Sequence, residues 1–378
     1  MTAEAVRAAV STVRDPELRQ PLGDLDMVRE IELADGRARV GIALTIVGCP
    51  AADRIERDVR SAALSVPGVA AVDVVVGVMT PDERAALTTR LRGDRGAREN
   101  PFGPDSLTRV VAITSGKGGV GKSTLTANLA VALARRGLAV GLIDADVHGF
   151  SIPGLLGLVG DDGLPPQPTR IDGLMLPPIA HEVRTISIGM FLPRDAAAPG
   201  AVAWRGPMLH RTVSQFLTDV YFGDIDVLLI DMPPGTGDVA ISVGQLLPHA
   251  DVVVVTTPQS AAADVAVRSG LVARQTGQRV VGVVENMAAM SLPDGTTLDL
   301  FGAGGGAAVA AALSSDADVP LLGSVPLSPT LRGDADAGRP VVVAHPDDPA
   351  ARAILDIADA IARYGRGLSG RPLPLHVR

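Results

Sequence analysis

The chain has 378 residues, of which 47% are hydrophobic, enough for one large core or two smaller domains. Its formal net charge of −8 and its 2% aromatic content argue against nucleic acid and membrane surfaces as partners. No apolar run approaches the roughly 18 residues of a membrane span, and no secretory signal opens the chain. A single cysteine excludes an intrachain disulfide, so we expect a cytoplasmic protein.

Residues 1–81 are predicted to form a small α/β domain. The expected elements are, in order, a helix over 3–13, strands over 27–33 and 37–46, a helix from Pro50 to about Leu64, and a strand over 69–78. Asp35-Gly36 is a favourable hairpin turn between the first two strands. Pro50 suits the first position of the second helix, where its missing N–H costs nothing.

Residues 82–107 differ in composition and are predicted to be a linker. They are rich in arginine, glycine and proline, which is typical of a turn-rich connection between domains. Acidic residues such as Glu83 and Asp94 alternate with the arginines. This mixture favours a solvated tether over a nucleic-acid-binding arm.

Residues 108–378 show short apolar strands alternating with helical stretches. The strands are expected at 110–114, 140–143, 186–188, 227–230, 252–255, 280–284 and 321–325. This alternation is typical of a doubly wound, mostly parallel sheet. The predicted fold class is therefore α/β, with a large sheet domain preceded by the small one.

A glycine-rich loop follows the first of these strands and matches the pattern G-x-x-x-x-G-K-[ST]. Its residues are Gly116, Lys117, Gly118, Gly119, Val120, Gly121, Lys122, Ser123 and Thr124. Of the 34 basic residues in the chain, these two lysines are the only ones that are not arginine. A compact ammonium group suits a phosphate oxygen in a tight loop, whereas a planar guanidinium does not. We expect a nucleotide-binding P-loop that opens a helix over 124–136.

Acidic residues end two of the predicted strands. Asp144 and Asp146 follow 140–143, and Asp231 follows 227–230. In P-loop proteins such an acid holds Mg²⁺ through water while the loop hydroxyl, here Ser123, binds the ion directly. The stretch 231–238, with its Pro-Pro-Gly, is predicted to sense hydrolysis as a switch.

Lys117 resembles the signature lysine of the deviant Walker A group, which contains nitrogenase iron protein, MinD, ParA and ArsA. Within this group the chain is most similar to the Mrp/ApbC family of iron–sulfur cluster carrier ATPases. The matching stretches are 144–153, 204–208, 231–238, 256–259, 284–287, 301–306 and 323–327. The first 81 residues resemble the SufT/PaaD-type domain through Asp15-Pro16-Glu17, Gly48-Cys49-Pro50 and Val78-Met79-Thr80.

The resemblance implies a Mg²⁺-dependent ATPase of the P-loop NTPase fold that forms a nucleotide-sandwich homodimer. Lys117 and Lys122 would bind ATP, with Lys117 reaching the nucleotide of the facing subunit. Asp146 would orient the attacking water and Asn286 would read the adenine edge. Asp144 and Asp231 would belong to the outer shell of Mg²⁺. Iron–sulfur assembly proteins and client apoproteins would be the partners.

One motif of the family is missing. The family carries Cys-Pro-x-Cys-Gly after the Glu-Asn-Met stretch, but here the segment 288–295 keeps the proline and the glycine and lacks both thiols, with Leu292 and Asp294 beside the proline. Neither suits an iron–sulfide cluster. The remaining thiol, Cys49, has two open interpretations. In the first, Cys49 is a cluster ligand or nucleophile, because the helix N-terminus lowers its pKa, although the charge of Asp53 opposes this effect. In the second, Cys49 is a buried apolar side chain. Any cluster held by Cys49 of two chains is expected to be labile.

Two other functions compete with that of a cluster carrier. A nucleotide-gated scaffold or regulator would bind a partner protein and carry no cluster, and the missing cysteines favour it. A positioning ATPase of the ParA or MinD kind is less favoured. The chain is acidic, and its end, 371–378, has no amphipathic membrane helix.

Overall fold

The computed structural model describes residues 2–93, 99–147, 149–192, 206–292, 294–315 and 317–363. The chain forms two compact units. The first contains Met1–Pro101, Pro166–Ile179 and Ser214–Asp224, and the second contains Phe102–Pro165, Ala180–Val213 and Ile225–Arg378. His148, Trp204 and Arg205 of the family stretches, Pro293, and the end at 371–378 lie outside the described residues.

The first unit is built on a three-stranded sheet in the order β1-β2-β3. Its elements are α1 (Ala3–Ser11), β1 (Val28–Ala34), β2 (Arg37–Leu44), α2 (Ala52–Leu64) and β3 (Ala71–Val78). They follow the predicted order. The turn residues Asp35 and Gly36 have φ of 48° and 75°, as a tight hairpin requires. β1 and β2 are antiparallel, whereas β2 and β3 are parallel with α2 as the crossover.

Two local features of this unit differ from expectation. Helix α2 begins at Ala52 and not at Pro50, because Gly48 has φ 71° and the Ala52 amide closes a turn onto the Cys49 carbonyl. Part of the stretch expected as a linker forms helix α3 (Pro81–Arg92). Thr80 and Glu83 build a full capping box at its start, with proline in the first turn.

Two segments distant in sequence join the same core. The hairpin β6 (Thr169–Ile171) and β7 (Leu174–Leu176) contributes three buried side chains. Tyr221 packs against this core, and its hydroxyl accepts a hydrogen bond of 2.8 Å from Gln20 Nε2. The first unit is therefore discontinuous along the chain.

The second unit contains an eight-stranded sheet in the order β15-β12-β11-β4-β10-β5-β9-β8. The strands are β4 (Arg109–Ser115), β5 (Val140–Asp144), β8 (Ile179–Ala180), β9 (Val183–Ser187), β10 (Val227–Asp231), β11 (Asp251–Thr256), β12 (Arg279–Ala288) and β15 (Leu321–Pro326). The six pairings from β15 to β9 are all parallel. The crossover order confirms the predicted doubly wound α/β class.

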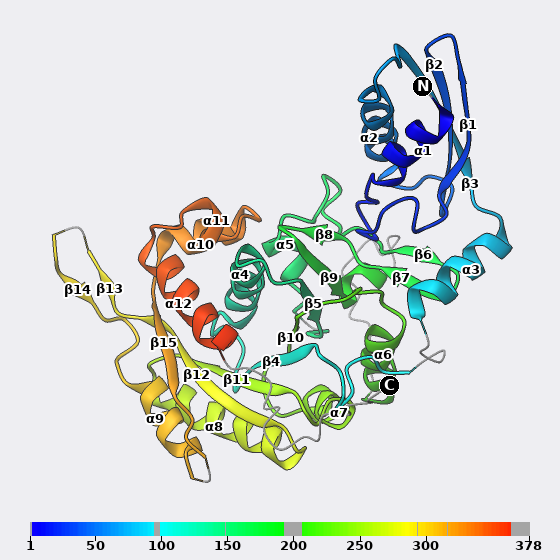
Figure 1. The fold of residues 1–378 in the computed structure, drawn as a ribbon. Coiled ribbons are helices and arrows are strands. Elements are labelled where there is room, and N and C mark those ends of the chain that lie inside the picture. The colour runs from blue at the N-terminus through cyan, green and yellow to red at the C-terminus, as the bar shows by residue number, and fades with distance from the viewer. Residues whose placement is uncertain are drawn as a thin grey trace, which may run out of the picture. The chain divides into compact units, whose positions relative to one another are not determined.

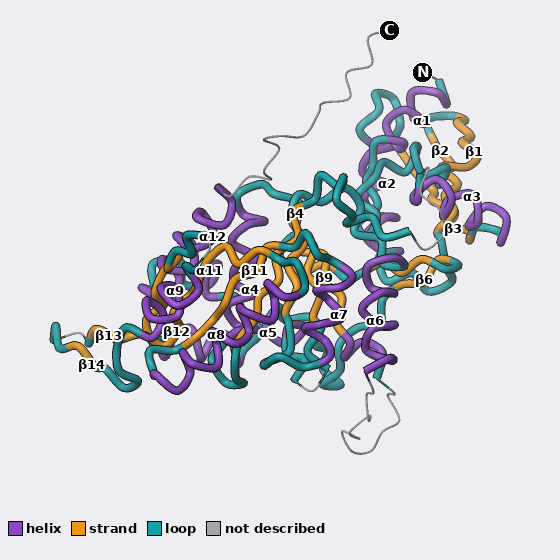
Figure 2. The backbone as a smooth tube through the Cα atoms, turned by 90° about the horizontal axis from the view of Figure 1, so that it is seen from below, coloured by secondary structure: helices purple, strands orange, loops and turns teal. Residues whose placement is uncertain are grey.

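Helices cover both faces of this sheet (Figure 1). Helices α4 (Lys122–Arg135), α5 (Ile152–Leu155), α8 (Ser260–Gln275), α9 (Gly305–Leu313) and α12 (Pro349–Arg363) pack against its strands. The unit also contains α7 (Asp238–Leu246), α10 (Pro329–Asp336), α11 (Val341–Ala344) and a 3-10 turn at Ile188–Phe191. Helix α6 (Gly206–Thr218) is divided between the two units, because Ser214 and the residues after it belong to the first. Beyond the sheet, β13 (Met290–Ser291) and β14 (Thr297–Leu298) form a hairpin after β12 that extends outward in both views (Figure 2).

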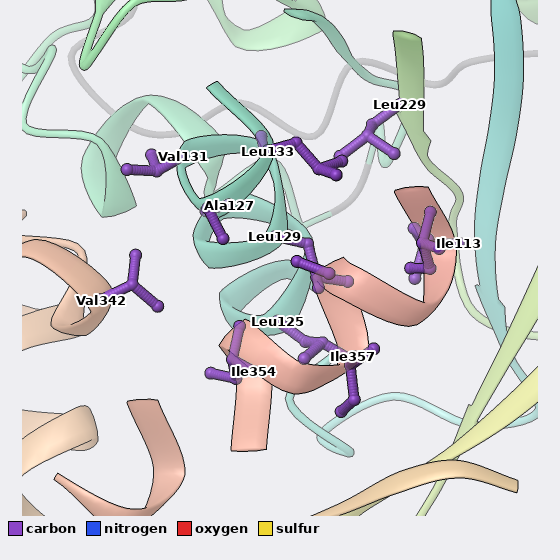
Figure 3. Close-up of a cluster of buried hydrophobic side chains, with 14 of the residues drawn as sticks. Ile113, Leu125, Ala127, Leu129, Val131, Leu133, Leu229, Val342, Ile354 and Ile357 are labelled. Carbon is purple, nitrogen blue, oxygen red and sulfur yellow. The ribbon is translucent and has the colours of Figure 1, made fainter. Parts of the chain in front are cut away.

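Helix α4 lies at the centre of the second core (Figure 3). Leu125 and Leu129 are buried with Ile113 of β4, while Ile354 and Ile357 of α12 belong to the same cluster. Gly137, with φ 86°, follows the helix and ends it as predicted. This packing fixes the position of α4, whose N-terminus follows the glycine-rich loop directly. Among the described residues, no helix has the length and apolar character to span a membrane.

Candidate active site

Three neighbouring strands bring the predicted site residues to one edge of the sheet. In the register of β10, Asp231 is paired with Ile113 of β4 on one side and with Asp144 of β5 on the other. The carboxyl ends of parallel strands form the binding edge of an open α/β sheet. The loop that follows β4 therefore lies beside both acids.

The glycines of the loop are required by its backbone. Gly119 and Gly121 have φ of 78° and 80°, in the left-handed region that glycine adopts at low cost. Gly116 approaches α8 so closely that a Cβ atom would lie 2.3 Å from the carbonyl carbon of Val265. Gly121 is the N-cap of α4 and provides no side-chain cap, so the first N–H groups of the helix remain available to an anion.

Asp231 is the centre of the site's hydrogen bonds. Lys122 Nζ lies 2.8 Å from its Oδ1, Ser123 Oγ donates to its Oδ2 at 2.6 Å, and Thr126 Oγ1 donates to its Oδ1 at 2.8 Å. The Asp231 side chain is fully buried, and the Lys122 side chain is 5% exposed. A buried ion pair with additional donors holds the lysine and the hydroxyl in fixed positions.

Asp144 is also fully buried, and its oxygens accept hydrogen bonds from the protein. Its Oδ2 accepts from Ser187 Oγ at 2.9 Å and from the Ile152 amide, and its Oδ1 accepts from the Asp146 amide at 3.2 Å. Burial, together with the negative charge of Asp231, raises the pKa of Asp144 to about 8.

Asp146 and Lys117 lie on separate elements around the loop. Asp146 follows β5, and its Oδ1 accepts a hydrogen bond of 3.0 Å from the Gly149 amide. Lys117 Nζ donates to Gln259 Oε1 at 3.2 Å, at the start of α8. Within the described part of the chain, the side-chain hydrogen bond of Lys117 is therefore to this amide, whereas Lys122 pairs with Asp231.

Asn286 lies on β12 directly over the loop. Its Nδ2 donates to the Val120 carbonyl at 2.8 Å, and the side chain is 7% exposed. The bond fixes which end of the amide faces the loop. The carbonyl end, Oδ1, is the acceptor that remains for another donor.

The donor set fits a magnesium nucleotide. Ser123 and Asp231 supply the hard oxygen atoms that Mg²⁺ prefers, and Lys122 supplies a compact positive charge for phosphate oxygens. The loop turns through two left-handed glycines, so its amides are exposed to an anion on one side. Mg²⁺ held here would neutralise the charge that develops on the phosphates.

Cys49 lies in a different environment from the one expected. Its side chain is 6% exposed, and its thiol donates to Glu17 Oε2 at 3.8 Å. Burial first, and then the charges of Glu17 and Asp15, raise the pKa of Cys49 to about 11. The expected lowering by the helix N-terminus is therefore wrong. The nearby amide of Ala51 does lower the pKa, but less than burial raises it.

The segment that stands in place of the family's cysteine motif forms a turn closed by hydrogen bonds. The Leu292 amide donates to the Thr296 carbonyl at 2.8 Å, and Asp294 Oδ1 accepts from the Thr296 amide at 2.9 Å. This turn joins β13 to β14. Among the described residues, no group of three His, Cys, Asp or Glu side chains is arranged to hold a metal ion.

The structure adds residues that the sequence did not single out. Thr126 is one helical turn after Lys122, so helical spacing could have identified it as a second hydroxyl for Asp231. Gln259 belongs to one of the family stretches, but its contact with Lys117 depends on tertiary packing. Ser187 meets Asp144 only because β9 pairs with β5.

Two family models match this chain, one in its N-terminal part and one in the remainder. A family model described as NUBPL iron-transfer P-loop NTPase matches residues 106–362, and one described as iron-sulfur cluster assembly protein matches residues 3–74. The iron-sulfur cluster carrier protein of Mycobacterium tuberculosis is 52% identical over 375 residues, covering 98% of this chain and 96% of the relative. That of Deinococcus radiodurans is 42% identical over 360 residues, covering 95% and 94%.

A solved structure is also similar in sequence. The nucleotide-binding protein of Archaeoglobus fulgidus, in complex with ADP, is 35% identical, covers 61% of this chain and 87% of its own, and has a TM-score of 0.46. The family model and the full-length relatives confirm the resemblance inferred from the motifs and the prediction of a P-loop ATPase. The chain therefore belongs to the family of NUBPL-type iron-transfer P-loop NTPases.

Proposed function

We propose that this ATPase is an iron–sulfur cluster carrier that works as a homodimer in the cytoplasm, delivering clusters to apoprotein clients. The observation that carries the proposal is the complete P-loop site around Asp231 in a chain related over its whole length to cluster carriers. A chain with a single cysteine is ordinary in the cytoplasm.

The residues divide the work of hydrolysis. Lys122 would exchange Asp231 for the β/γ-phosphates, and Ser123 and Asp231 are the residues that would hold Mg²⁺, which would supply positive charge to the phosphates. Asp146 orients the attacking water. The switch 231–238 is tied to the loop strand, because the Gly235 amide donates to the Ser115 carbonyl at 2.8 Å. A change at the γ-phosphate would therefore reach 231–238 through few bonds.

Homodimer formation has its own test. Lys117 would complete the site of the facing subunit, so Lys117→Ala should bind ATP and hydrolyse it poorly. Random mixing with Asp146→Ala should restore about a quarter of the parent activity, because half of the dimers are mixed and each has one complete site of two. Each variant alone is the control. Tagged copies should show that mixed dimers form, and absence of rescue would then place Lys117 in its own site.

Cluster binding is tested by anaerobic reconstitution. Iron, sulfide and the visible absorption spectrum should be measured on the parent and on Cys49→Ser. Coordination requires the Cys49 thiolate, so iron must displace the hydrogen bond to Glu17, and we expect a labile cluster. Cys49→Ser should hold no iron while its ATPase rate is unchanged. A variant that keeps the iron would exclude Cys49 as a ligand.

A second function is favoured by the turn between β13 and β14. Its positions 292 and 294 offer no thiol and are closed by their own hydrogen bonds. A nucleotide-gated scaffold that binds a partner protein needs no cluster ligand there. A reconstituted parent protein that holds no iron, with ATPase activity intact, would select this function.

A further inference from the structure

Strand β12 departs from regular geometry just beside the P-loop. Against β15, Asn286 is paired with Val325 and Ala288 with Pro326, so Met287 is an extra residue on one strand. Met287 has φ 58°, in the left-handed region. Such a β-bulge bends the strand, and the left-handed conformation of a residue with a side chain costs on the order of 1 kcal/mol.

The bulge directs two consecutive side chains to the same place. In a regular strand, successive side chains point to opposite faces of the sheet. Here a Cβ atom on Gly121 would lie 2.2 Å from Asn286 Nδ2 and 3.7 Å from Met287 Cε. Asn286 also donates to the carbonyl of Val120. Both side chains therefore lie over the last residue of the loop before Lys122.

Gly121 controls the geometry of the phosphate site. It is the N-cap of α4, and Lys122 and Ser123 are the first two helical residues. A small rotation at Gly121 would change the directions of the Lys122 ammonium and of the first helix amides. A contact that restrains Gly121 therefore restrains the groups that bind phosphate.

We propose that Met287 is a positioning residue for ATP binding, whose bulge and thioether side chain hold Gly121 in the conformation that binds the nucleotide phosphates. The inference rests on the ATPase activity and is independent of cluster carriage. Met287 lies against the loop at Gly121. Met287 therefore influences phosphate binding through the conformation of the loop at Gly121.

The test is a series of substitutions at one position, followed by steady-state ATPase kinetics. Met287→Ala removes the cover from Gly121 and should raise KM for ATP about 5- to 10-fold with kcat within about twofold, since ground-state and transition-state binding are lost together. Met287→Leu keeps an apolar side chain of similar length and should stay within about twofold of the parent KM.

Two more variants separate the bulge from the side chain. Met287→Gly accepts a positive φ without strain, so it keeps the bulge, and it should raise KM as Met287→Ala does. Met287→Val, whose β-branched side chain disfavours this conformation, should raise KM at least as much. Met290→Ala, on β13 three residues later, is the matched control and should leave KM unchanged.

A parent-like KM for both Met287→Ala and Met287→Gly would overturn the proposal. So would a Met287→Leu variant that loses as much as Met287→Ala, because an apolar cover would then not be what restrains the loop. The glycine variant keeps the test valid if the alanine variant does not fold. Lys122→Ala, measured beside them, shows separately whether the P-loop is the ATPase site.

Discussion

The P-loop edge of the second unit and the surroundings of Cys49 in the first unit bury reactive groups in opposite ways. At the loop, the Asp231 carboxylate faces an ammonium group and two hydroxyl donors. Around Cys49, the thiol lies beside Glu17 and near Asp15, and burial raises the pKa of both acids. The first arrangement stabilises charge, and the second keeps a thiol neutral.

The two environments differ in how far each is preorganised for its function. ATP binding needs Lys122 to exchange one anionic oxygen for another, so the site is ready within a single chain. Iron binding needs a proton to leave Cys49 beside acidic groups, so it requires rearrangement. Nucleotide hydrolysis and cluster binding should therefore respond very differently to mutation.

The largest effect is expected at the centre of the loop site. Lys122→Ala should lower the ATPase rate by at least about 100-fold, because the charge that neutralises the β/γ-phosphates is lost. It also leaves Asp231 buried without its ion pair, which should lower the free energy of unfolding by about 3–5 kcal/mol. Phosphate release and urea denaturation measure the two effects.

The control for Lys122 is on the same helix. Arg135 lies in the last turn of α4 and donates to the Val342 carbonyl, far along the helix from the loop. Arg135→Ala should keep the ATPase rate. If Lys122→Ala hydrolysed ATP at the parent rate, the assignment of the P-loop as the ATPase site would be wrong.

The second effect concerns thiol reactivity. With the pKa of Cys49 raised from 9.0 to about 11, the folded protein at pH 8 should contain about 100-fold less thiolate than the unfolded chain, and burial slows alkylation further. Mass spectrometry after iodoacetamide treatment, with and without urea, measures the ratio of the alkylation rates in the folded and unfolded chain.

The raised pKa of Cys49 also affects the stability of the fold. Because the folded-state pKa is raised, the free energy of unfolding should fall as pH rises from about 9 to about 11.

Glu17→Gln provides the matched change. It removes one of the charges that raise the Cys49 pKa, so native alkylation should become faster. Equal alkylation rates in the folded and unfolded parent would show that the thiol is not protected. The contrast between the two regions would then disappear.

Local sequence patterns predicted the strand before the loop and the helix after it, since a P-loop is one strand, one turn and one helix. Distant contacts were not predictable in this way. Nothing near 166–179 or Tyr221 indicates packing into the first unit, which depends on contacts such as the Gln20 to Tyr221 hydrogen bond. The raised pKa of Cys49 follows the same rule: its helix position is local, whereas its burial depends on tertiary packing and Glu17 is 32 residues away.

Helix α3 is an error of a different kind, because its signal was local. The arginines and glycines of 82–107 indicated a linker, but Thr80 and Glu83 form a capping box and Pro81 occupies the first turn. Leu87 and Leu91 are buried in the core of the first unit. The capping box, the proline and the two buried leucines therefore decided the structure here, and not the composition.

The smallest effect should separate the stability of α3 from catalysis. Thr80→Ala removes the hydroxyl that accepts from the Glu83 amide, at a cost of about 1 kcal/mol. Hydrogen exchange over 81–92 should become faster by the corresponding factor of about five. Thr89→Ala is the control, because its hydroxyl donates to the Ala85 carbonyl within the helix and its loss should be near neutral. The ATPase rate should be unchanged in both variants. Exchange over 81–92 that is already unprotected in the parent would show that the stretch is a tether after all.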